Sequence, residues 1–379
     1  LHNRYCLRNQ ETPRLVKKNL GSPDDRLNAQ PMTQPRKATI YDIARLSGAS
    51  PSTVSAALSG AWKARRISES TVETIRKIAA EQGYATNMQA RGLRQARSGL
   101  VGLIIPVHDN RFFSSMSQSF EAQARDRGLV PVIASSLRDP AEEMRIVETL
   151  ASYAVEYLFV AGATDPDSIS AFCNAAGLRH IFVDLPGSGG PSVISDNHRG
   201  ATDLAEKLLA EKPDLPQEAR NKIYFLGGNR SSHATSRRIE AFRAALTRHG
   251  TPPLPEQIIT CGYAPRSAMR EIAALMDRLG GLPAGLFVNS LTAFEGVLGH
   301  FVNLPPEAFA QSVIGCYDYD PFAAYLQFPV HMVRQNSNHM IEQAYALIDQ
   351  GINDARVIEV EPELIQPRTI YKGLFGEMG

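Results

Sequence analysis

Eight short apolar runs, separated by stretches long enough for a helix, dominate the chain from Leu100 onward. In chain order they read LVGLIIPV, LVPVIA, YLFVAG, HIFVDL, KIYFLGG, QIITCG, GLFVNS and SVIGCY. A continuous apolar run of this length predicts a strand that is buried on both faces, as in a parallel sheet. Strands that alternate with helices are typical of doubly wound α/β folds. The runs form two sets, and each set is large enough for a sheet of its own.

The two sets of runs define the expected boundaries of two lobes. The first lobe is expected over 99–195 and 321–352, and the second over 196–320 and 353–379. In open α/β sheets, ligands bind beyond the carboxyl ends of the strands. We therefore expect an α/β body over 99–379, with two doubly wound parallel-sheet lobes and a ligand-binding cleft between them.

Charge is distributed unevenly along the chain, although its net charge is only +1. Residues 36–97 carry a net charge of +7, whereas residues 98–379 carry a net charge of −9. A small basic segment joined to an acidic body is the expected pattern of a protein that binds a polyanion. A solvated basic face without a partner has the same composition, so motifs must decide between the two.

Cysteine spacing and hydropathy restrict the class of protein further. The four cysteines never occur at C-x-x-C spacing, which argues against a zinc site or a disulfide framework and favours a reducing cytoplasm. No apolar stretch approaches the ~18 residues of a membrane span. We expect a cytoplasmic protein without metal, cofactor or membrane association. Residues 1–35 show no helix or strand period and predict a disordered tail, with Met32 as a candidate natural start.

The segment 36–84 carries the capping signals of three short helices. Thr39, with Asp42 three residues later, predicts a capping box at the start of the first helix. Gly48 permits a tight turn, and Ser50 caps the second helix. Two short helices joined by such a turn and supported by a third form a helix-turn-helix, whose second helix enters the major groove of DNA. A small structural bundle is the alternative interpretation.

Two motifs stand in the head: residues 39–44, Thr-Ile-Tyr-Asp-Ile-Ala, and residues 47–55, Ser-Gly-Ala-Ser-x-x-Thr-Val-Ser. They resemble the opening signature of the lactose repressor (LacI/GalR) family of bacterial transcriptional regulators. Residues 81–87 resemble its exit from the third helix, and residues 90–93 resemble its hinge helix. The resemblance continues to about Phe375, so it covers nearly the whole chain after the tail.

The resemblance implies that the head binds double-stranded DNA. Most of the side chains expected at the DNA are small and polar, or cationic, and reach base edges or phosphates without steric conflict. They are Thr39, Tyr41, Ser50, Pro51, Ser52, Thr53, Ser55, Lys63, Arg65, Arg66, Asn87, Ala90 and Leu93.

The head departs from the family pattern in three places. Ala56 stands where the family often has Arg, and Ser59 stands where it usually has Asn. The loop 62–66, Trp-Lys-Ala-Arg-Arg, is longer and more basic than in the family. These changes predict more contact with phosphates and leave open which base sequence is recognised. Trp62 is either a plug beneath this loop or a DNA contact.

Residues 85–98 are expected to form a hinge helix and linker. The resemblance implies that the two hinges of a homodimer pack together on the DNA, where Leu93 wedges into the minor groove. So short a helix is marginal in water, and Gly92 weakens it further. A segment that becomes helical only when the attached bodies hold it correctly is suited to switching DNA binding on and off. The alternative for Leu93 is an ordinary contact with its own body.

The resemblance also implies which residues bind a small-molecule effector between the lobes. They are Asp109, Phe112, Phe113, Asp196, Arg238, Tyr263, Asn289, Ser290 and Asp318. One of the two phenylalanines is expected in the core, and Arg238 has a surface ion pair as its alternative role. Ser290 stands where the family commonly has an Asp that accepts hydrogen bonds from the ligand. This change points to an effector other than a plain neutral sugar, such as a sugar phosphate, or to Asn289 in place of that Asp.

These observations predict a repressor that binds a palindromic operator as a homodimer and responds to a sugar or sugar phosphate. A dimer is favoured over a tetramer because no added heptad segment follows the body. A sugar-binding transport protein would require a signal peptide and no basic head. A sugar-phosphate enzyme of the doubly wound class is the other alternative, although we find no G-x-G-x-x-G after a strand, P-loop, H-E-x-x-H or G-x-S-x-G motif.

Overall fold

A computed structural model of the chain describes residues 38–84 and 97–368. The chain divides into two compact units, Leu1–Asn87 and Met88–Gly379, which are described separately below. The expected tail 1–35 lies outside the described residues. The same holds for the expected hinge positions Asn87, Ala90 and Leu93.

The head contains three helices: α1 (Ile40–Ser47), α2 (Pro51–Ser59) and α3 (Glu69–Glu81). The capping box predicted for α1 is present, because the Thr39 backbone N–H donates to Asp42 Oδ2 at 2.9 Å and the Asp42 N–H donates to Thr39 Oγ1 at 3.4 Å. The chain turns at Gly48, whose φ of 68° is readily adopted only by glycine. The apolar faces of all three helices meet in one small core.

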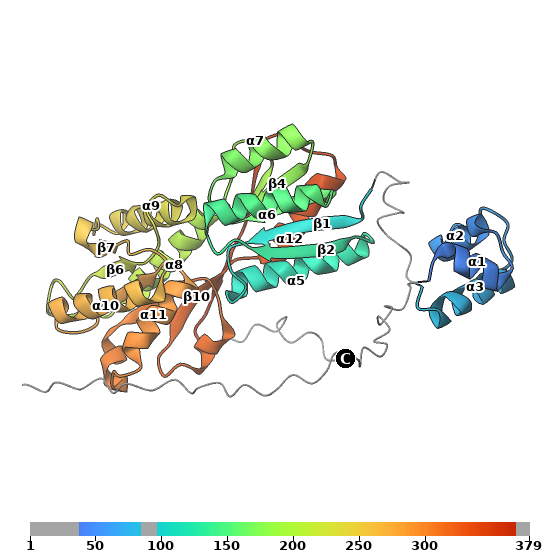
Figure 1. Ribbon diagram of the computed structural model, residues 1–379. Coiled ribbons are helices and arrows are strands. Elements are labelled where there is room, and N and C mark those ends of the chain that lie inside the picture. The colour runs from blue at the N-terminus through green and yellow to red at the C-terminus, as the bar shows by residue number, and fades with distance from the viewer. Residues whose placement is uncertain (1–37, 85–96, 369–379) are drawn as a thin grey trace, which may run out of the picture. The chain divides into compact units, whose positions relative to one another are not determined.

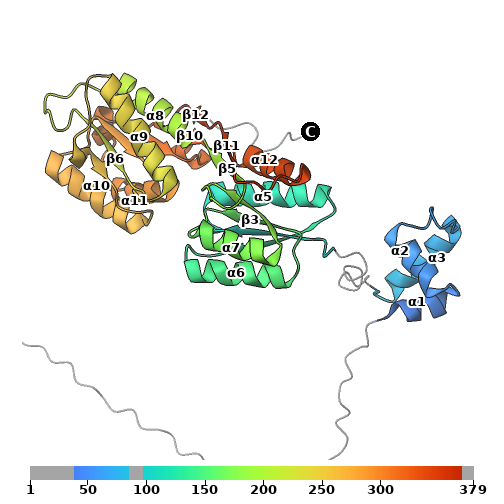
Figure 2. The same ribbon diagram turned by 90° about the horizontal axis from the view of Figure 1, so that it is seen from above.

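Lobe one of the body is built on a six-stranded parallel sheet with the strand order β11-β5-β4-β3-β1-β2. The strands are β1 (Leu100–Ile105), β2 (Val130–Ser135), β3 (Tyr157–Ala161), β4 (Arg179–Val183), β5 (Ser192–Ser195) and β11 (Val357–Val360). Its helices are α5 (Arg111–Asp126), α6 (Pro140–Ser152), α7 (Pro166–Ala176) and α12 (Ser337–Asp349). Helices α5 and α12 cover one face of the sheet, and α6 and α7 cover the other (Figure 2).

Lobe two repeats this three-layer arrangement around a second six-stranded sheet with the order β12-β10-β9-β8-β6-β7. The strands are β6 (Ile223–Leu226), β7 (Ile258–Ile259), β8 (Gly285–Val288), β9 (Val313–Tyr317), β10 (Val330–Arg334) and β12 (Glu363–Ile365). All pair in parallel except β12, which is antiparallel to β10. Helices α8 (Asn197–Glu211) and α9 (His233–Arg248) pack on one face, and α10 (Pro265–Leu279) and α11 (Leu291–Phe301) pack on the other (Figure 1).

The chain crosses between the lobes three times, and two of the crossings differ from the sequence-based expectation. The first follows β5. Strand β10 lies in the second sheet and β11 in the first, so 321–334 belongs to lobe two and 353–360 to lobe one. The later crossings therefore lie between β10 and α12 and between β11 and β12. An apolar run marks where a strand forms, but the sheet it joins depends on a partner strand far away in the sequence.

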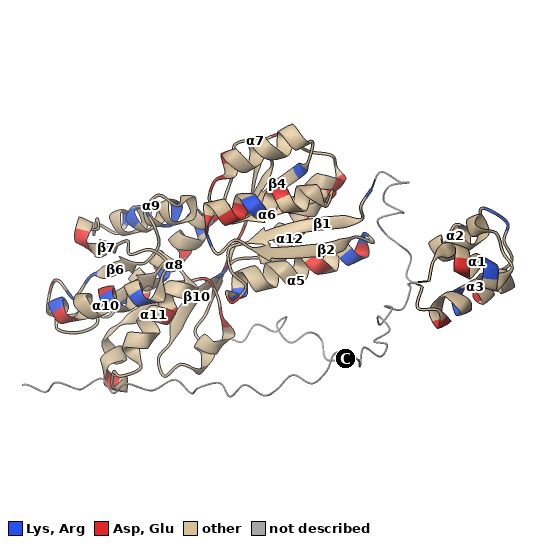
Figure 3. Ribbon diagram, viewed as in Figure 1, with Lys and Arg blue, Asp and Glu red and all other residues tan. Residues whose placement is uncertain are grey.

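Charged residues are distributed over both units, and the loop between α2 and α3 is marked by Lys and Arg (Figure 3). Both signs are interspersed on the helices of the body. Within 38–84 and 97–368, no helix combines the length and apolar character needed to cross a bilayer.

Candidate functional site

The start of α2 presents hydroxyl groups to solvent. Ser50 and Ser52 are exposed, as is Pro51 between them, while Thr53 and Ser55 are half-buried. The Ser50 hydroxyl caps α2 by accepting from the Thr53 backbone N–H at 3.1 Å, and it lies 2.8 Å from Ser52 Oγ. These small hydroxyls leave room for a duplex to approach the helix end closely.

The flanking residues of the head extend this exposed surface. Tyr41 is 71% exposed, and half-buried Thr39 lies beside it at the start of α1. Ala56, in contrast, is buried, so no side chain projects from this position toward a ligand.

The loop after α2 is a folded turn that carries three exposed cations. Trp62 is partly buried against the head core, as the plug interpretation expects. Its carbonyl accepts from the backbone N–H groups of Arg65 at 3.2 Å and Ile67 at 3.0 Å. Lys63, Arg65 and Arg66 are exposed, and Lys63 Nζ lies 5.3 Å from the Trp62 ring centre. The packed indole thus supports a basic edge next to α2.

Arg238 of α9 lies at the centre of a polar cluster in lobe two. Its side chain is 3% exposed, so the alternative of a surface ion pair is wrong. Nε donates to Asn197 Oδ1 at 2.8 Å, and Nη1 donates to the Asn289 backbone carbonyl at 2.6 Å. The guanidinium carbon lies 3.6 Å from the ring centre of Tyr317. These contacts fix the guanidinium in a single orientation.

Two carboxylates share the electrostatic field of Arg238. Asp318 follows β9 and is buried; its Oδ1 accepts from Gln335 Nε2 at 2.6 Å, and its Oδ2 accepts from the Leu291 N–H at 3.2 Å. Asp184 follows β4 of lobe one. Burial raises the pKa of Asp184 to about 6, with Asp318 adding to the rise and Arg238 opposing it. Burial also raises the pKa of Asp318, again opposed by Arg238.

Tyr263 belongs to a chain of hydrogen bonds that holds Asn289 and continues to Ser232, to whose Oγ the Tyr263 hydroxyl donates at 3.3 Å. The Tyr263 hydroxyl lies 2.8 Å from Thr235 Oγ1, to which Asn289 Nδ2 donates at 3.3 Å. Within the described part of the chain, Asn289 Oδ1 and Gln335 Oε1 are buried acceptors without a hydrogen-bond partner. Buried acceptors in this state are expected to receive a donor from water or a ligand.

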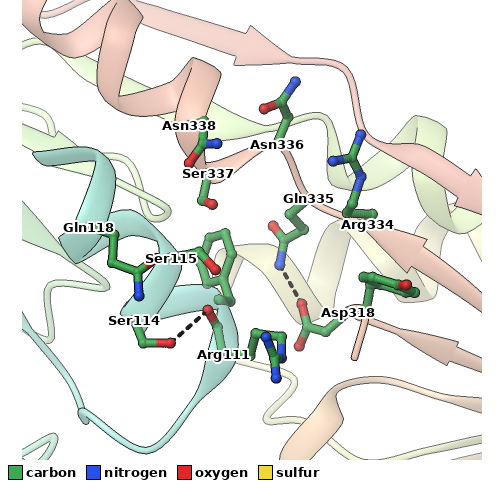
Figure 4. A pocket seen from close by; sticks show the side chains of 12 residues that line it. Arg111, Ser114, Ser115, Gln118, Asp318, Arg334, Gln335, Asn336, Ser337 and Asn338 are labelled. Atoms are coloured by element: carbon green, nitrogen blue, oxygen red, sulfur yellow. Dashed lines mark hydrogen bonds between the residues drawn. The ribbon is translucent and has the colours of Figure 1, made fainter. Parts of the chain in front are cut away.

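A cavity of about 340 Å³ opens beside Asp318, where the start of α5 faces the crossing from β10 to α12 (Figure 4). Phe112 and Gln118 line its lobe-one side, and Gln335, which is bonded to Asp318, lines the crossing. Arg111 Nε donates to Asp320 Oδ2 at 2.7 Å and so joins the two lobes at the edge of this cavity.

The structure brings together only part of the predicted effector set. Phe113 is packed in the lobe-one core, as expected for one of the two phenylalanines. Asp196 caps α8 through the Arg199 N–H at 2.9 Å, and Ser290 caps α11 through the Ala293 N–H at 3.3 Å. Both side chains therefore hold a helix end.

Asp109 of lobe one is exposed, and its charge acts on Glu295 of lobe two. Burial raises the pKa of Glu295, and the charges of Asp109 and Asp320 raise it further. Asp184 was missed by the sequence reasoning, although its position after the apolar run HIFV is a signal of the same kind that identified the other strand ends.

The polar cluster around Arg238 adjoins the cavity through Asp318 and Gln335, and it combines acceptors and donors suited to a hydroxylated ligand. Carboxylate and amide oxygens accept from hydroxyl groups, while Arg238 is a donor fixed between them. Among the described residues, no group of three or more His, Cys, Asp or Glu side chains is arranged to hold a metal ion. The arrangement supports recognition of a small polar molecule.

Comparison with known proteins gives consistent matches over both units. Residues 39–87 match the model of bacterial regulatory proteins of the lacI family. Residues 98–298 match the model of periplasmic binding proteins and the sugar binding domain of the LacI family.

Two operon repressors are among the similar proteins. The chain is 48% identical over 197 residues to the ribitol operon repressor of Klebsiella aerogenes, covering 52% of this chain and 73% of that protein. It is 29% identical over 321 residues to the sucrose operon repressor of Klebsiella pneumoniae, covering 84% of this chain and 93% of that protein.

Solved structures share the fold. The lac repressor dimer bound to operator and the anti-inducer ONPF has a TM-score of 0.72 at 19% identity, covering 88% of this chain and 99% of that one. The Cra regulator of Pseudomonas putida in complex with fructose 1-phosphate has a TM-score of 0.63 at 24% identity, covering 72% and 99%. From the matches over the head and over more than half of the chain, we conclude that the chain belongs to the lacI family of bacterial regulatory proteins.

Proposed function

We propose that this protein is a transcriptional repressor that binds a palindromic operator as a homodimer and releases it when a small hydroxylated effector enters the cleft. The observation that carries the proposal is the buried polar cluster around Arg238, in which Asn289 Oδ1 and Gln335 Oε1 are acceptors without a hydrogen-bond partner among the described residues. The 48% identity to a ribitol operon repressor supports genes of polyol or sugar use as the target.

The proposed DNA contacts form two groups in the head. Small side chains at the starts of α1 and α2 approach the bases and nearby phosphates, and the exposed cations after α2 bind phosphates. The first group is Thr39, Tyr41, Ser50, Pro51, Ser52, Thr53 and Ser55. The second group is Lys63, Arg65 and Arg66. Asn87, Ala90 and Leu93 stay predictions for the hinge.

The proposed effector contacts are Arg238, Asn289, Asp318, Tyr263 and Phe112, to which we add Asp184. Occupancy of the cleft favours one closure angle of the lobes. In the proposed dimer, that angle sets the separation of the two hinges and hence their ability to order on DNA. A coupling of this kind commonly amounts to about 1–3 kcal/mol.

The proposed role is a binding role without catalysis. The two operon repressors named above are regulators, and the polar cluster around Arg238 offers hydrogen-bonding groups suited to binding a ligand. A repressor of this kind acts in the cytoplasm, where the chromosome lies.

DNA binding is tested by electrophoretic retardation on the upstream region of the chain's own gene, measured over a series of salt concentrations. We expect a shift at low salt that weakens as salt rises, because binding to phosphates releases counterions. Replacing Lys63, Arg65 and Arg66 together by Ala is expected to reduce the slope of log K against log salt by about 0.9 for each phosphate that the variant no longer neutralises.

Arg76→Ala is the matched control, because this exposed arginine lies on α3, outside the proposed DNA surface. It is expected to leave the slope unchanged. Absence of any shift at low salt would contradict the proposal. A shift that ribitol and related sugars leave unaffected would contradict only its effector part.

A further inference from the structure

The turn that joins β2 to α6 has an unusual backbone for its sequence. Leu137 and Arg138 have φ values of 52° and 60°, and the Asp139 N–H donates to the Ser136 carbonyl at 3.0 Å. Two consecutive residues with positive φ are normally Gly, Asn or Asp. Leu and Arg adopt this conformation only at a cost in free energy, and such strain tends to occur at functional sites.

The strained turn places Arg138 at the boundary between the lobes. Its guanidinium carbon lies 5.9 Å from the ring centre of Phe113 in lobe one and 5.2 Å from that of Tyr263 in lobe two. Arg138 is exposed, and no carboxylate forms an ion pair with it in the part of the chain that the structure describes. Burial raises the pKa of Asp184 and Asp318, and the charge of Arg138 opposes that rise, which places Arg138 within electrostatic reach of both carboxyl groups.

Arg138 and Arg238 differ in how many of their N–H donors are available to a ligand. Arg238 is buried, donates to Asn197 and Asn289, and covers the Tyr317 ring. The faces of the Arg138 guanidinium are near two rings, while its N–H groups have no acceptor among the described residues. A guanidinium has five donors and no acceptor, so its best partner is an oxygen that carries no proton of its own.

We propose that Arg138 is a specificity-determining residue that donates to a proton-free oxygen of the effector, either the carbonyl of a keto sugar or the phosphate of a sugar phosphate. The inference rests on the proposed function of the cleft as the effector site. The carboxylates Asp184 and Asp318 accept hydrogen bonds from the hydroxyl groups of such a ligand, while Arg138 donates to its carbonyl or phosphate oxygen. A fully reduced polyol has only hydroxyls, and the one at Arg138 would need a separate acceptor for its proton.

The test measures binding of three probes to the full-length protein by isothermal titration calorimetry: ribitol, the ketopentose D-ribulose and ribitol 5-phosphate. We expect ribulose or ribitol phosphate to bind at least about 10-fold more tightly than ribitol, as a charge-assisted hydrogen bond predicts. Which of the two binds more tightly identifies the group that Arg138 reads.

Arg138→Gln is expected to lower the affinity for the preferred ligand by about 10- to 100-fold and to leave the affinity for ribitol unchanged. Arg138→Lys keeps the charge but lacks the planar guanidinium, so we expect its affinity for the preferred ligand to lie between those of the wild type and Arg138→Gln. Arg179→Gln is the matched control: Arg179 lies over the Tyr157 ring at 4.4 Å, at the amino ends of β3 and β4 and away from the cleft.

Arg138→Gly gives a readout independent of ligand. Glycine adopts the φ of 60° without strain, so we expect this variant to melt at a higher temperature than the wild type while it loses the ligand preference.

Equal affinity of the wild type for all three probes would overturn the inference. So would an equal loss of affinity for all three in Arg138→Gln, because that result indicates a structural role. Binding of ribitol alone overturns this inference and leaves the proposed function standing. Failure of all three probes to bind overturns the inference and the proposed polyol effector together.

Discussion

The two lobes share one architecture but contribute different groups to the cleft. Lobe two supplies side chains that are buried and fixed by several contacts, such as Arg238, Asn289 and Asp318. Lobe one supplies exposed or singly held side chains, such as Arg138 and Arg111. A group that is already fixed loses little entropy when a ligand binds, whereas an exposed group must be ordered at that moment. The comparison predicts that lobe two provides affinity and that lobe one provides selectivity and closure.

The largest effect is expected from Arg238→Ala, which tests the preorganised side of the comparison. The change removes two hydrogen bonds and the stronger of the two cationic charges that act on Asp184 and Asp318, so we expect unfolding to become easier by about 3–5 kcal/mol. The effector response should be abolished while DNA affinity stays near that of the wild type. Denaturant titration and retardation assays with and without effector measure the two quantities.

Arg237→Ala is the control for Arg238, since this neighbour on α9 pairs with Glu240 at the surface. Its stability should change by less than about 1 kcal/mol. Simultaneous loss of DNA binding and effector response in Arg238→Ala would indicate a folding defect and remove its value as a test of the cleft.

An intermediate effect is expected from Asp184, the lobe-one carboxylate held in the field of lobe two. Its pKa rises from 3.8 to about 6 on folding, so its contribution to stability is present below pH 4 and is lost as pH rises through 6. Asp184→Asn should therefore stabilise the ligand-free protein at pH 7 by about 1–3 kcal/mol.

The same variant should flatten the decline in unfolding free energy between pH 4 and 6. Denaturant midpoints measured across this range provide the comparison with the wild type. An unchanged pH profile would show that Asp184 is as well solvated as the exposed carboxylates.

The smallest effect is expected from the ion pair between Arg111 and Asp320, which joins the lobes. The arginine side chain is 41% exposed, so the pair should contribute less than about 1 kcal/mol. Arg111→Ala and Asp320→Ala should each change effector affinity by less than about 5-fold, and the double variant should equal either single one. Additive effects in this double-mutant cycle would mean that the pair does not couple the lobes.

The features that could be predicted from the sequence are those that depend on neighbouring residues along the chain. The capping box at Thr39, the cap at Ser50 and the apolar runs of the inner strands each have a local physical cause. Strand β10 was missed because VHMVR lacks a continuous apolar run, and its place in the second sheet depends on pairing with β9. Arg138 was missed because its partners, Phe113 and Tyr263, are distant in the sequence.

The three crossings between the lobes have a consequence for synthesis of the protein on the ribosome. Lobe one needs Met340, Ile341 and Tyr345 of α12 in its core and β11 at its edge, and lobe two needs β10 and β12. Neither half of the sensor is complete until nearly the last of these residues has been translated. The head, in contrast, is complete once residue 84 has emerged. A nascent chain therefore carries all three helices of its head long before it carries anything able to respond to a metabolite.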